Sequence, residues 1–302
     1  MILTTRCNSF EDKAVVGKFS STSKPRGQVW IFFENESPNY FSKKQCLPAM
    51  NNKINWTVTY RRDADFTITY GYFRKSTKPK YSLGHLDGIY AKKTKTAVVF
   101  MSNCDTFSKR MKFIKSLRSH GVDVDIFGKC GKVLDKSDNK GRFQSVYNIS
   151  RTLTPDFFPS VLARYKFYLS FENSLCLDYT TEKSLHRVMQ HPIVPVIRDG
   201  SNTSLFHPHH SYINTEDYKS VKDLAQYMKK LANDKTAYLE YFNWKRYYYT
   251  DDLYIEWNNV FCRMCERLHN PESFRRIYRN ITSWHMSPGG KNACYEPTDL
   301  NI

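Results

Sequence analysis

The stretch that decides the fold has three segments, which are Tyr165-Lys-Phe-Tyr-Leu-Ser-Phe-Glu-Asn-Ser174, Asp178-Tyr-Thr-Thr-Glu-Lys183 and Val194-Pro-Val196. Its aromatic and aliphatic run over residues 166–171 predicts a buried strand. This strand delivers Glu172 and Asn173 to its carboxyl end, where open parallel sheets bind their ligands. These two polar residues are therefore the first candidates for a site.

A helix is expected directly after this strand, with Thr180 or Thr181 as its N-cap and with Glu182 and Lys183 in its first turn. The helix dipole favours a glutamate at that place, so capping alone accounts for Glu182. The same dipole disfavours a lysine, although exposed lysines near helix starts are common. An anion held between the free N–H groups and the ammonium of Lys183 would turn this misfit into a binding site.

Strands alternate with helices on both sides of this stretch. Apolar runs predict strands over residues 29–33, 97–101, 122–127 and 193–197, and helical spacing predicts helices over residues 109–120, 157–165, 182–190 and 220–232. The last helix opens on a capping box from Ser220 to Asp223, and the tail over residues 235–268 is predicted to be mostly helical. The alternation indicates an α/β protein with parallel sheets and right-handed crossovers.

The charge of the chain is strongly positive. The 302 residues carry a formal net charge of +17, and 40% of them are hydrophobic, which argues against disorder as the main state. Lysines and arginines are spread along the sequence among acidic residues, so the charge suits a polyanionic substrate such as a nucleotide sugar as well as a nucleic acid. No nucleic-acid-binding motif accompanies it, and no nucleic acid partner is expected.

The eight cysteines are compatible with either redox compartment. Cys262 and Cys265 form a CxxC, but no second pair completes a zinc site. Four N-glycosylation triplets favour the secretory pathway, and they begin at Asn55, Asn148, Asn202 and Asn280, whereas a fifth at Asn35 is discounted because Pro38 follows it. No signal peptide and no span of transmembrane length is found in the sequence. We therefore expect either a cytosolic protein or a sequence that lacks its targeting segment, and the motifs below favour the second.

The three quoted segments closely resemble the signature of the α1,3-fucosyltransferases, glycosyltransferase family 10. Further segments resemble other motifs of that family in the same order along the chain. They are Glu34-Asn-Glu-Ser-Pro38, Thr59-Tyr-Arg-Arg-Asp-Ala-Asp65, Ser102-Asn103 with Arg110 downstream, Tyr241-Phe-Asn-Trp244 and Cys262-x-x-Cys265. Chance does not account for so many ordered matches over most of the chain.

The resemblance implies the GT-B fold, an α/β architecture with two facing Rossmann-like domains on parallel sheets, the active site in the cleft and C-terminal helices returning across it. We expect an acceptor-side domain over residues 1–85 that is incomplete at its N-terminus, a donor-binding domain over residues 86–245, and a helical segment over residues 246–302 that packs back on the first domain. The resemblance also implies an inverting transfer of L-fucose from GDP-fucose to a glycan hydroxyl on a glycoprotein or glycolipid, with an α1,3 linkage to N-acetylglucosamine.

Such a displacement requires a base for the acceptor hydroxyl and cations for the leaving diphosphate. Glu36 follows the strand at 29–33 and matches the family's catalytic glutamate, whereas without the family Glu34 would be an equal candidate. Arg110, early in the helix at 109–120, and Lys183 are expected to neutralise the leaving group.

The resemblance gives three further residues a role at the donor. Glu182 is expected to accept hydrogen bonds from ribose or fucose hydroxyls, and Asn173 and Tyr179 are expected to bond the sugar or the phosphates. Two cations and a helix start can neutralise the diphosphate, so no metal or other cofactor is required, and manganese is expected at most to stimulate.

Three segments have the composition of a metal site but are interpreted otherwise. Asp63-Ala-Asp65 lies in the acceptor half, and Asp123-Val-Asp125 alternates within a strand. His207-Pro-His-His210 is interpreted as a polar surface loop.

The chain departs from the family's pattern in three respects. Family members are usually type II membrane proteins of the Golgi lumen, so an anchor, a stem and the βα unit before Ile2-Leu-Thr-Thr5 are expected to be missing here. The family pairs the thiols of Cys262 and Cys265 with cysteines near the start of the catalytic domain, which are expected to precede Met1 here, so both thiols are expected to lack these partners unless Cys7 serves. Residues 184–192 and 197–200 differ from the usual small-residue pattern, so we expect an altered sugar end of the donor pocket.

Topology alone predicts one disulfide. Cys130 follows the strand at 122–127 and Cys176 follows the strand at 166–171, so both stand at the carboxyl edge of what is expected to be one sheet. We expect them to pair and to brace the donor loop.

Two alternative functions stay open. One is fucosylation of protein side chains, and the other is a catalytically impaired carbohydrate-binding remnant. The acceptor itself is not predicted, because acceptor choice depends on variable loops of the first half.

Overall fold

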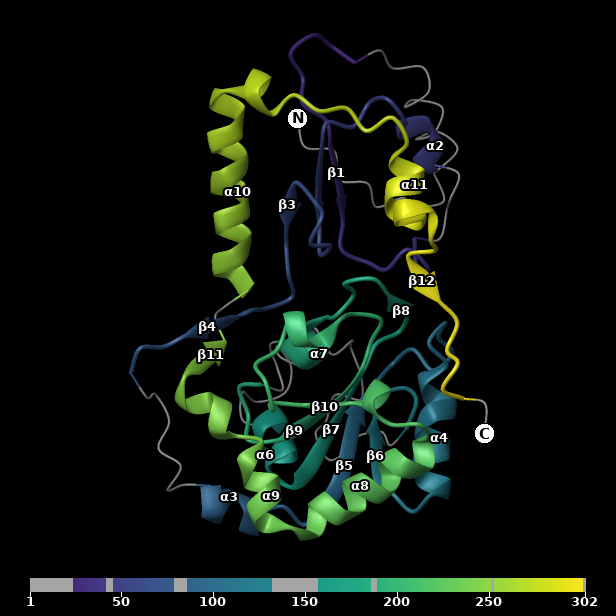
Figure 1. Cartoon of the computed structure of the whole chain (residues 1–302), viewed down its shortest axis with the longest axis vertical. Helices are drawn as coiled ribbons and strands as arrows, with labels where there is room; N and C mark the ends of the chain where they lie inside the picture. Colours follow the sequence, from purple (N-terminus) through teal and green to yellow (C-terminus); the bar gives the residue numbers. More distant parts are fainter. Residues whose placement is uncertain are drawn as a thin grey trace, which may run out of the picture. The chain divides into compact units, whose positions relative to one another are not determined.

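The structure is a computed structural model that describes residues 24–41, 46–78, 86–131, 157–185, 189–250 and 253–300. The chain forms two compact units, whose elements are labelled in Figure 1. Unit 1 comprises Met1–Tyr70, Cys176–Tyr179 and Asp252–Tyr295, and unit 2 comprises Gly71–Leu175, Thr180–Asp251 and Glu296–Ile302. Predictions about residues 2–5, Cys7, the Asn148 triplet and residues 186–188 lie outside the described residues.

Unit 1 is built on a small parallel sheet in the order β1-β2-β3. The strands are β1 (Ile31–Glu34), β2 (Trp56–Thr59) and β3 (Phe66–Thr67). Ile31 lies opposite Trp56, and Val58 lies opposite Phe66. The strand predicted at 29–33 is confirmed as β1, whereas β2 and β3 were not predicted.

Each face of this sheet has its own core because successive side chains of a strand point to opposite faces. Phe32 packs with residues of α2 (Cys46–Met50) and α11 (Ile281–Met286). Ile31 packs with residues of α10 (Leu253–His269) instead. Figure 1 shows β1 between α10 on one side and α2 and α11 on the other. Both faces are therefore covered, and a site in this unit belongs at the strand ends.

Unit 2 contains a five-stranded parallel sheet in the order β10-β9-β7-β5-β6. Its strands are β5 (Lys95–Phe100), β6 (Val124–Phe127), β7 (Tyr165–Phe171), β9 (Val194–Arg198) and β10 (Ile213–Asn214). The predicted strands at 97–101, 122–127, 166–171 and 193–197 are confirmed. From β5 the chain builds β6 on one side and then β7, β9 and β10 on the other, so the strand order reverses between β5 and β7. Open α/β sheets bind ligands beyond the carboxyl ends of the strands at such a reversal.

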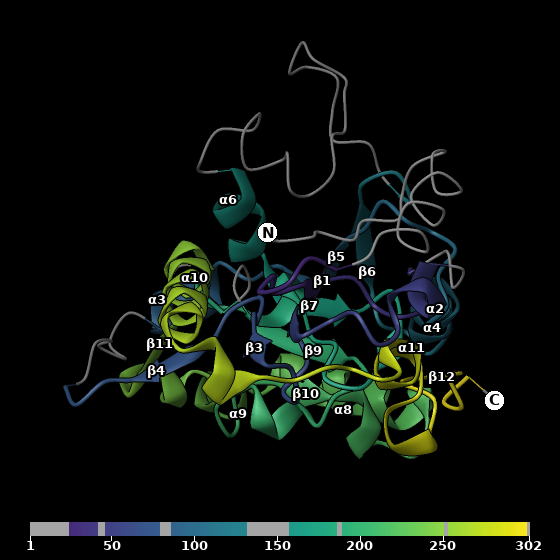
Figure 2. The same ribbon diagram turned by 90° about the horizontal axis from the view of Figure 1, so that it is seen from above.

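Helices cover both faces of the unit 2 sheet. The larger core lies under α4 (Arg110–Ser119), α8 (Val221–Asn233) and α9 (Lys235–Glu240), and α6 (Phe157–Ala163) packs on the opposite face. Figure 2 shows α6 on one side of the strands and α8 and α9 on the other. The helix start predicted at Ser220 is confirmed, because the Ser220 hydroxyl caps α8 by accepting the Asp223 N–H at 3.1 Å.

The tail over residues 235–268 is mostly helical, as predicted, but it is not continuously so. An antiparallel pair joins β11 (Tyr248–Thr250) to β4 (Phe73–Lys75) in unit 2, so a strand interrupts the expected helix over residues 235–268. The tyrosine-rich sequence at this point accounts for the strand, since aromatic residues favour strands. The remaining short elements are α3 (Leu86–Ala91), β8 (Leu175–Cys176), α7 (Glu182–Leu185), η2 (Thr203–Leu205), η3 (Thr215–Asp217), η4 (Asn243–Arg246), η5 (Pro271–Phe274), η6 (Pro288–Gly290) and β12 (Cys294–Tyr295).

The predicted disulfide between Cys130 and Cys176 is wrong. Cys130 pairs with Cys104, and Cys176 pairs with Cys294. The strand order explains the error, because β5 lies between β6 and β7. Residues at the ends of β6 and β7 are therefore separated by two strand spacings, roughly 9.5 Å, and a disulfide needs Cα atoms within about 7 Å. Cys104 follows β5, the direct neighbour of β6.

Two further sequence features can be placed. Cys262 and Cys265 are exposed free thiols among the residues that the structure describes, and Cys7 is not one of those residues. Within the same residues, every helix is too short or too polar to cross a bilayer.

Candidate functional site

The reversal point of the unit 2 sheet is closed by hydrogen bonds between the loop after β5 and the end of β7. Arg110, the first residue of α4, is buried and donates from Nη1 to the Phe171 carbonyl at 2.9 Å and from Nη2 to the Asn103 carbonyl at 3.0 Å. The Ser108 N–H donates to the Asn173 carbonyl at 3.0 Å. Arg110 is thus fixed at the place where the topology predicts a ligand.

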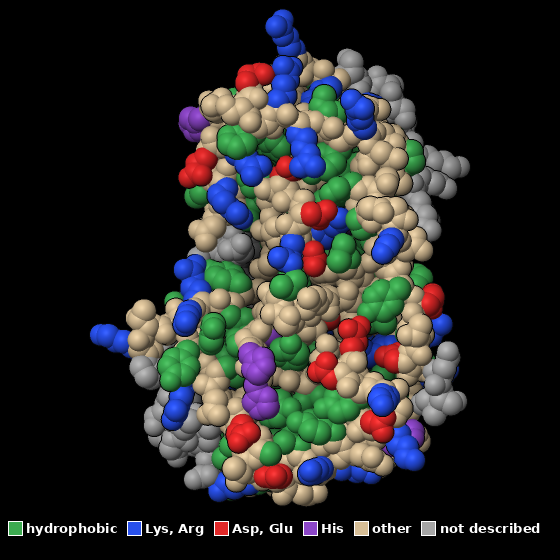
Figure 3. Space-filling view, in the orientation of Figure 1, with side chains coloured by type: hydrophobic (Ala, Val, Ile, Leu, Met, Phe, Trp, Pro, Cys, Tyr) green, Lys and Arg blue, Asp and Glu red, His purple; other side chains and the backbone are tan. Residues whose placement is uncertain are grey.

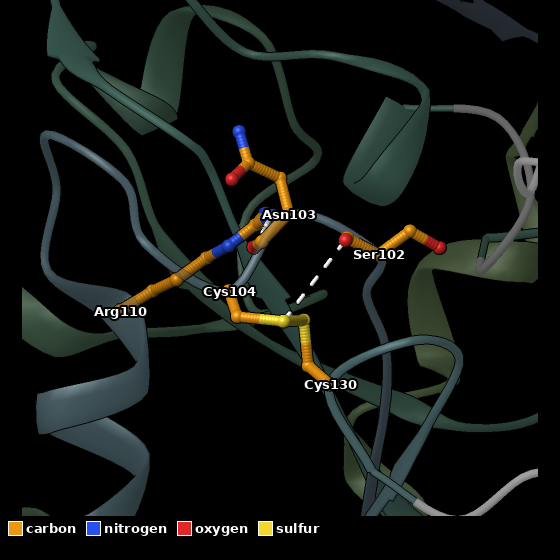
Figure 4. Close-up of a disulfide and its surroundings, with 5 residues drawn as sticks. All are labelled: Ser102, Asn103, Cys104, Arg110 and Cys130. Carbon is orange, nitrogen blue, oxygen red and sulfur yellow. Dashed lines mark hydrogen bonds between the residues drawn. A yellow bond between two sulfur atoms is a disulfide. The ribbon is translucent and has the colours of Figure 1, made fainter.

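A disulfide braces the same loop from the side of β6. Figure 4 shows Cys104 and Cys130 joined beside Asn103, toward which the Arg110 side chain points. The turn that carries Cys130 depends on Gly128, whose φ of 103° is a conformation that favours glycine. The loop after β5 is therefore tied to strands on both of its sides.

Glu172, at the end of β7, organises the segment that precedes α7. Its side chain is only 1% exposed. One carboxylate oxygen accepts the Thr181 N–H at 2.9 Å and the Thr181 hydroxyl at 2.7 Å, and the other accepts the Lys183 ammonium at 2.8 Å. A buried carboxylate is costly unless it is paired, so these contacts fix Thr181 and Lys183 together.

Lys183 keeps its positive charge in this setting. Burial lowers the pKa of its ammonium, but the carboxylates of Glu172 at 2.8 Å and Glu182 at 3.7 Å outweigh burial and raise the pKa overall. The positive charge of Arg110 acts in the opposite direction, which shows that the two cations lie within electrostatic range. The side chain of Lys183 remains 22% exposed, so an anion can still approach it.

The helix after Thr181 is shorter than predicted. The Thr181 carbonyl accepts the N–H groups of Ser184 and Leu185, as expected for the N-cap, but α7 ends at Leu185 and residues 186–188 are not described. Residues 189–190 lie in a turn, so the helix does not reach Gln190 as predicted.

The structure brings four of the predicted donor-side residues to one edge of unit 2, and they are Arg110, Asn173, Glu182 and Lys183. The side-chain oxygen Oδ1 of Asn173 is buried and accepts no hydrogen bond from the described residues. An amide oxygen in that state needs a donor, which a bound ligand or water can supply.

Two residues that sequence reasoning did not assign stand at the end of β9. Arg198 is 1% exposed, donates to the Ser108 carbonyl at 2.8 Å and forms two hydrogen bonds to the Asp299 carboxylate, both at 2.7 Å. Asp199 follows it, and burial raises the pKa of its carboxyl to about 7. The signal in the sequence was the departure noted at residues 197–200, where two charged residues replace small ones.

The predicted base lies in unit 1, at the end of β1. Glu36 is exposed, whereas Glu34 is buried and its carboxylate accepts the Glu36 N–H at 2.7 Å. Glu34 therefore shapes the turn. The side chain of Glu36 accepts a hydrogen bond at Oε2 from the Tyr179 hydroxyl at 3.1 Å. The structure thus joins Tyr179 to Glu36 within unit 1.

Tyr60 follows β2 and completes this part of unit 1. Its ring packs edge-on against Tyr179, with centroids 5.0 Å apart. Burial raises the pKa of the Tyr60 phenol well above its usual value, and the carboxylates of Glu34, Asp178 and Glu36 add to the effect. The Tyr60 hydroxyl is therefore a neutral group beside a cluster of carboxylates.

One aspartate of each Asp-x-Asp segment is engaged in structural contacts. Asp65 accepts the Thr57 N–H at 2.9 Å and the Tyr278 hydroxyl at 2.8 Å. Asp125 accepts the Lys95 ammonium at 2.5 Å and the Tyr165 hydroxyl at 2.6 Å. In the described part of the chain, no three His, Cys, Asp or Glu side chains are grouped closely enough to hold a metal ion.

The basic residues do not form one patch on the face that Figure 3 displays. Lysine and arginine side chains are scattered there, and aspartate and glutamate side chains stand among them. The distribution on this face agrees with the interleaving of charges along the sequence.

The fold places the chain in the GT-B class of α/β glycosyltransferases. A solved structure described as an α1,3-fucosyltransferase with GDP-fucose matches it with a TM-score of 0.53 at 16% identity, covering 92% of this chain and 91% of that chain. A second, described as an α1,3-fucosyltransferase with GDP, matches with a TM-score of 0.50 at 17% identity over 91% of each chain. At these identities the likeness shows the fold alone.

The chain belongs to glycosyltransferase family 10, the fucosyltransferases. The family models described as "Glycosyltransferase family 10 (fucosyltransferase) C-term" and "Fucosyltransferase, N-terminal" match residues 90–284 and 3–71. Human alpha-(1,3)-fucosyltransferase 4 is 31% identical over 283 residues, which cover 92% of this chain and 49% of that protein. Alpha-(1,3)-fucosyltransferase C of Drosophila melanogaster is 34% identical over 275 residues, which cover 85% and 59%. This chain spans about half the length of the curated relatives it matches.

Proposed function

We propose that this chain transfers L-fucose from GDP-fucose to a glycan hydroxyl, with inversion at the anomeric carbon. Membership of the family and the names of its relatives support fucose transfer. The observation that carries the proposal is the pair of cations, Lys183 and Arg110, at the reversal point of the unit 2 sheet. A diphosphate leaving group requires positive charge at such a place.

The reaction is a single displacement. The acceptor oxygen forms a bond to the anomeric carbon while the bond from that carbon to the β-phosphate oxygen breaks. The acceptor proton passes to the Glu36 carboxylate, and GDP leaves with the extra negative charge. Lys183 stabilises this charge because its ammonium is held in place by Glu172 and stays protonated. Arg110 contributes a second, delocalised cation.

Glu182 and Asn173 suit the hydroxyl-rich part of the donor. The Glu182 carboxylate lies beside Lys183 and can accept hydrogen bonds from ribose or fucose hydroxyls. The buried Oδ1 of Asn173 is an acceptor of the same kind. We also propose an α1,3 linkage to N-acetylglucosamine on a glycoprotein or glycolipid, and action in the Golgi lumen. The two disulfides support an oxidising compartment.

The first experiment tests the reaction itself. Purified protein is incubated with GDP-fucose and a panel of glycan and polypeptide acceptors, and the linkage and anomeric configuration of the product are read by NMR. The proposal expects an inverted fucoside on a glycan, and Glu36→Gln is expected to lower the rate at least a hundredfold. Full activity in that variant, or a retained configuration, would remove the mechanism. Transfer only to polypeptide would overturn the acceptor class.

The second experiment tests the leaving-group cations. Lys183→Ala and Arg110→Ala are each expected to lower turnover at least a hundredfold while leaving the circular dichroism spectrum unchanged. Lys115→Ala is the matched control, because Lys115 is an exposed cation on the same helix as Arg110. The scheme requires no metal, so transfer is expected to persist in a chelator and to be at most stimulated by manganese.

A further inference from the structure

The last described residues of the chain, residues 296–300, belong to unit 2, and Figure 1 shows this segment running beside α4. Two side chains fasten it there. Leu300 is 6% exposed and belongs to the core under α4, α8 and α9. The Asp299 carboxylate accepts two hydrogen bonds from Arg198, one from Nε and one from Nη2, both at 2.7 Å. The segment is therefore docked on unit 2 by an apolar contact and by a two-point ion pair.

The burial of Arg198 makes this ion pair necessary. The side chain of Arg198 is only 2% exposed, whereas that of Asp299 is 38% exposed. A buried cation is costly unless it is paired, so the guanidinium depends on the carboxylate that the end of the chain supplies. The guanidinium also lies over the Phe113 ring of α4, 4.7 Å from its centre. The carboxylate and the ring together hold it in one orientation.

The remaining nitrogen of the guanidinium holds the loop before α4. Nη1 of Arg198 donates to the Ser108 carbonyl at 2.8 Å. The same serine is bound to the end of β7, because its hydroxyl donates to the Glu172 carbonyl at 2.6 Å and its N–H donates to the Asn173 carbonyl at 3.0 Å. Ser108 is fully buried. It is thus held between the ends of β7 and β9, two residues before Arg110.

The backbone that joins Ser108 to Arg110 transmits a shift from one to the other. The residue between them, Lys109, has a φ of 51°, in the left-handed region that a residue other than glycine adopts only where its surroundings impose it. Lys109 is also the N-cap of α4, and Arg110 is the first residue of that helix. Releasing the Ser108 carbonyl would let this turn relax and would move the start of α4 together with the Arg110 side chain.

We infer that Asp299 is a positioning residue for Arg110, the proposed leaving-group cation. It acts through Arg198, which holds the Ser108 carbonyl in place while its own charge is paired. This inference rests on the role of Arg110 in the proposed function. It gives the end of the chain a part in turnover that the sequence motifs do not indicate.

Asp299→Asn tests this role, because it keeps the shape of the side chain and removes the charge that pairs with Arg198. Displacing a catalytic group by about 1 Å costs on the order of a hundredfold in rate. Arg110 keeps its hydrogen bonds to the Phe171 and Asn103 carbonyls, so we expect a smaller fall in kcat with GDP-fucose, of about tenfold. In the Arg110→Ala background the same substitution should have no further effect, because no guanidinium is left to position.

Arg198→Lys is a second variant, in which the charges stay paired and the fold is expected to be kept. An ammonium lacks the planar fork that bonds the Asp299 carboxylate and the Ser108 carbonyl together, so kcat should again fall about tenfold. Glu296→Gln is the matched control, because Glu296 is an exposed carboxylate of the same segment and its partner, Lys109, is also exposed. Its kcat is expected to equal that of the unmodified protein.

Circular dichroism shows which variants fold, and Arg198→Lys decides the question if Asp299→Asn does not. An unchanged kcat in the folded variants, with Arg110→Ala impaired, would overturn the inference and leave the proposed function intact. A fall that persists in the Arg110→Ala background would also overturn it, because the end of the chain would then act through other parts of the fold. Full activity in Arg110→Ala would instead reject the proposed leaving-group cation.

Discussion

Removing the negative charge of Glu172 should destabilise the protein far more than removing an equally short but exposed ion pair. Glu172→Gln keeps the shape of the side chain and one acceptor oxygen for Thr181, but it places an amide where the Lys183 ammonium now finds a carboxylate at 2.8 Å. The glutamate is 1% exposed and Lys183 is 22% exposed, so the loss is that of a mostly buried pair. We expect the free energy of unfolding to fall by about 3 kcal/mol.

Urea unfolding followed by circular dichroism measures this loss. Glu296→Gln is the control, because the Glu296 carboxylate meets Lys109 at a similar 3.0 Å while the two side chains are 73% and 53% exposed. Solvent screens that pair, and its loss should cost less than about 1 kcal/mol. A double-mutant cycle of Glu172→Gln with Lys183→Met should show strong coupling. Equal losses in the two glutamine variants, or an additive cycle, would refute the view that burial makes Glu172 the anchor of Lys183.

Three further predictions concern burial and backbone geometry. Burial lowers the pKa of His285 to about 3, so the neutral side chain stabilises the fold above pH 6.5 and this stability is lost as the pH falls toward 3. By pH 5 the free energy of unfolding should have fallen by about 2 kcal/mol. Thermal melts at pH 7 and pH 5 should show a smaller loss of stability in His285→Phe than in the unmodified protein. Burial raises the pKa of Asp199 to about 7, so its protonated form stabilises the fold at low pH, and this stability is lost as the pH rises from 3.8 through 7. The Tm of Asp199→Asn should therefore exceed that of the unmodified protein by more at pH 8 than at pH 5. Gly128→Ala should cost about 2 kcal/mol or more in urea unfolding, because its Cβ would clash with the Met101 carbonyl oxygen and its φ of 103° disfavours alanine. An unchanged midpoint would contradict that clash.

Long apolar runs made most of the unit 2 sheet predictable. The strands at 97–101, 166–171 and 193–197 are buried, so their sequences are mostly apolar, whereas the strand at 122–127 alternates valine with aspartate over its first four residues. The strands that were not predicted are short or contain both apolar and polar residues. β3 and β10 have two residues each, too few for a period to show, and β2 contains two threonines. β11 was hidden in an aromatic tail whose spacing also suits a helix.

The disulfides show what strand prediction alone leaves out. Cys130 follows β6 as predicted, but Cys176 lies in β8, which pairs with β12 in a separate two-stranded sheet and not with the unit 2 sheet. In addition, β5 lies between β6 and β7. Strand order depends on which crossovers the whole sheet accepts. When several parallel strands have similar sequences, no short segment of the chain indicates their order in the sheet.

Part of the candidate site was predictable, because its residues follow strands that the sequence predicts. Arg110, Asn173, Glu182 and Lys183 follow strands β5 and β7, whose carboxyl ends meet at the reversal point, so topology brings them to one edge. The role of Glu172 was not predicted, because its contacts to Thr181 and Lys183 depend on how the chain turns between residues 173 and 181. Family position favoured Glu36 over Glu34, and the structure adds that Glu34 is buried in the turn.

The central claim is that the diphosphate of the donor is held by Lys183 and Arg110. A crystal structure of the protein grown with GDP is the measurement that tests it most directly. We expect phosphate oxygens within hydrogen-bonding distance of the Lys183 ammonium and the Arg110 guanidinium, beyond the carboxyl ends of β5 and β7. Density for GDP bound at any other edge of the unit 2 sheet, or in unit 1, would contradict the assignment.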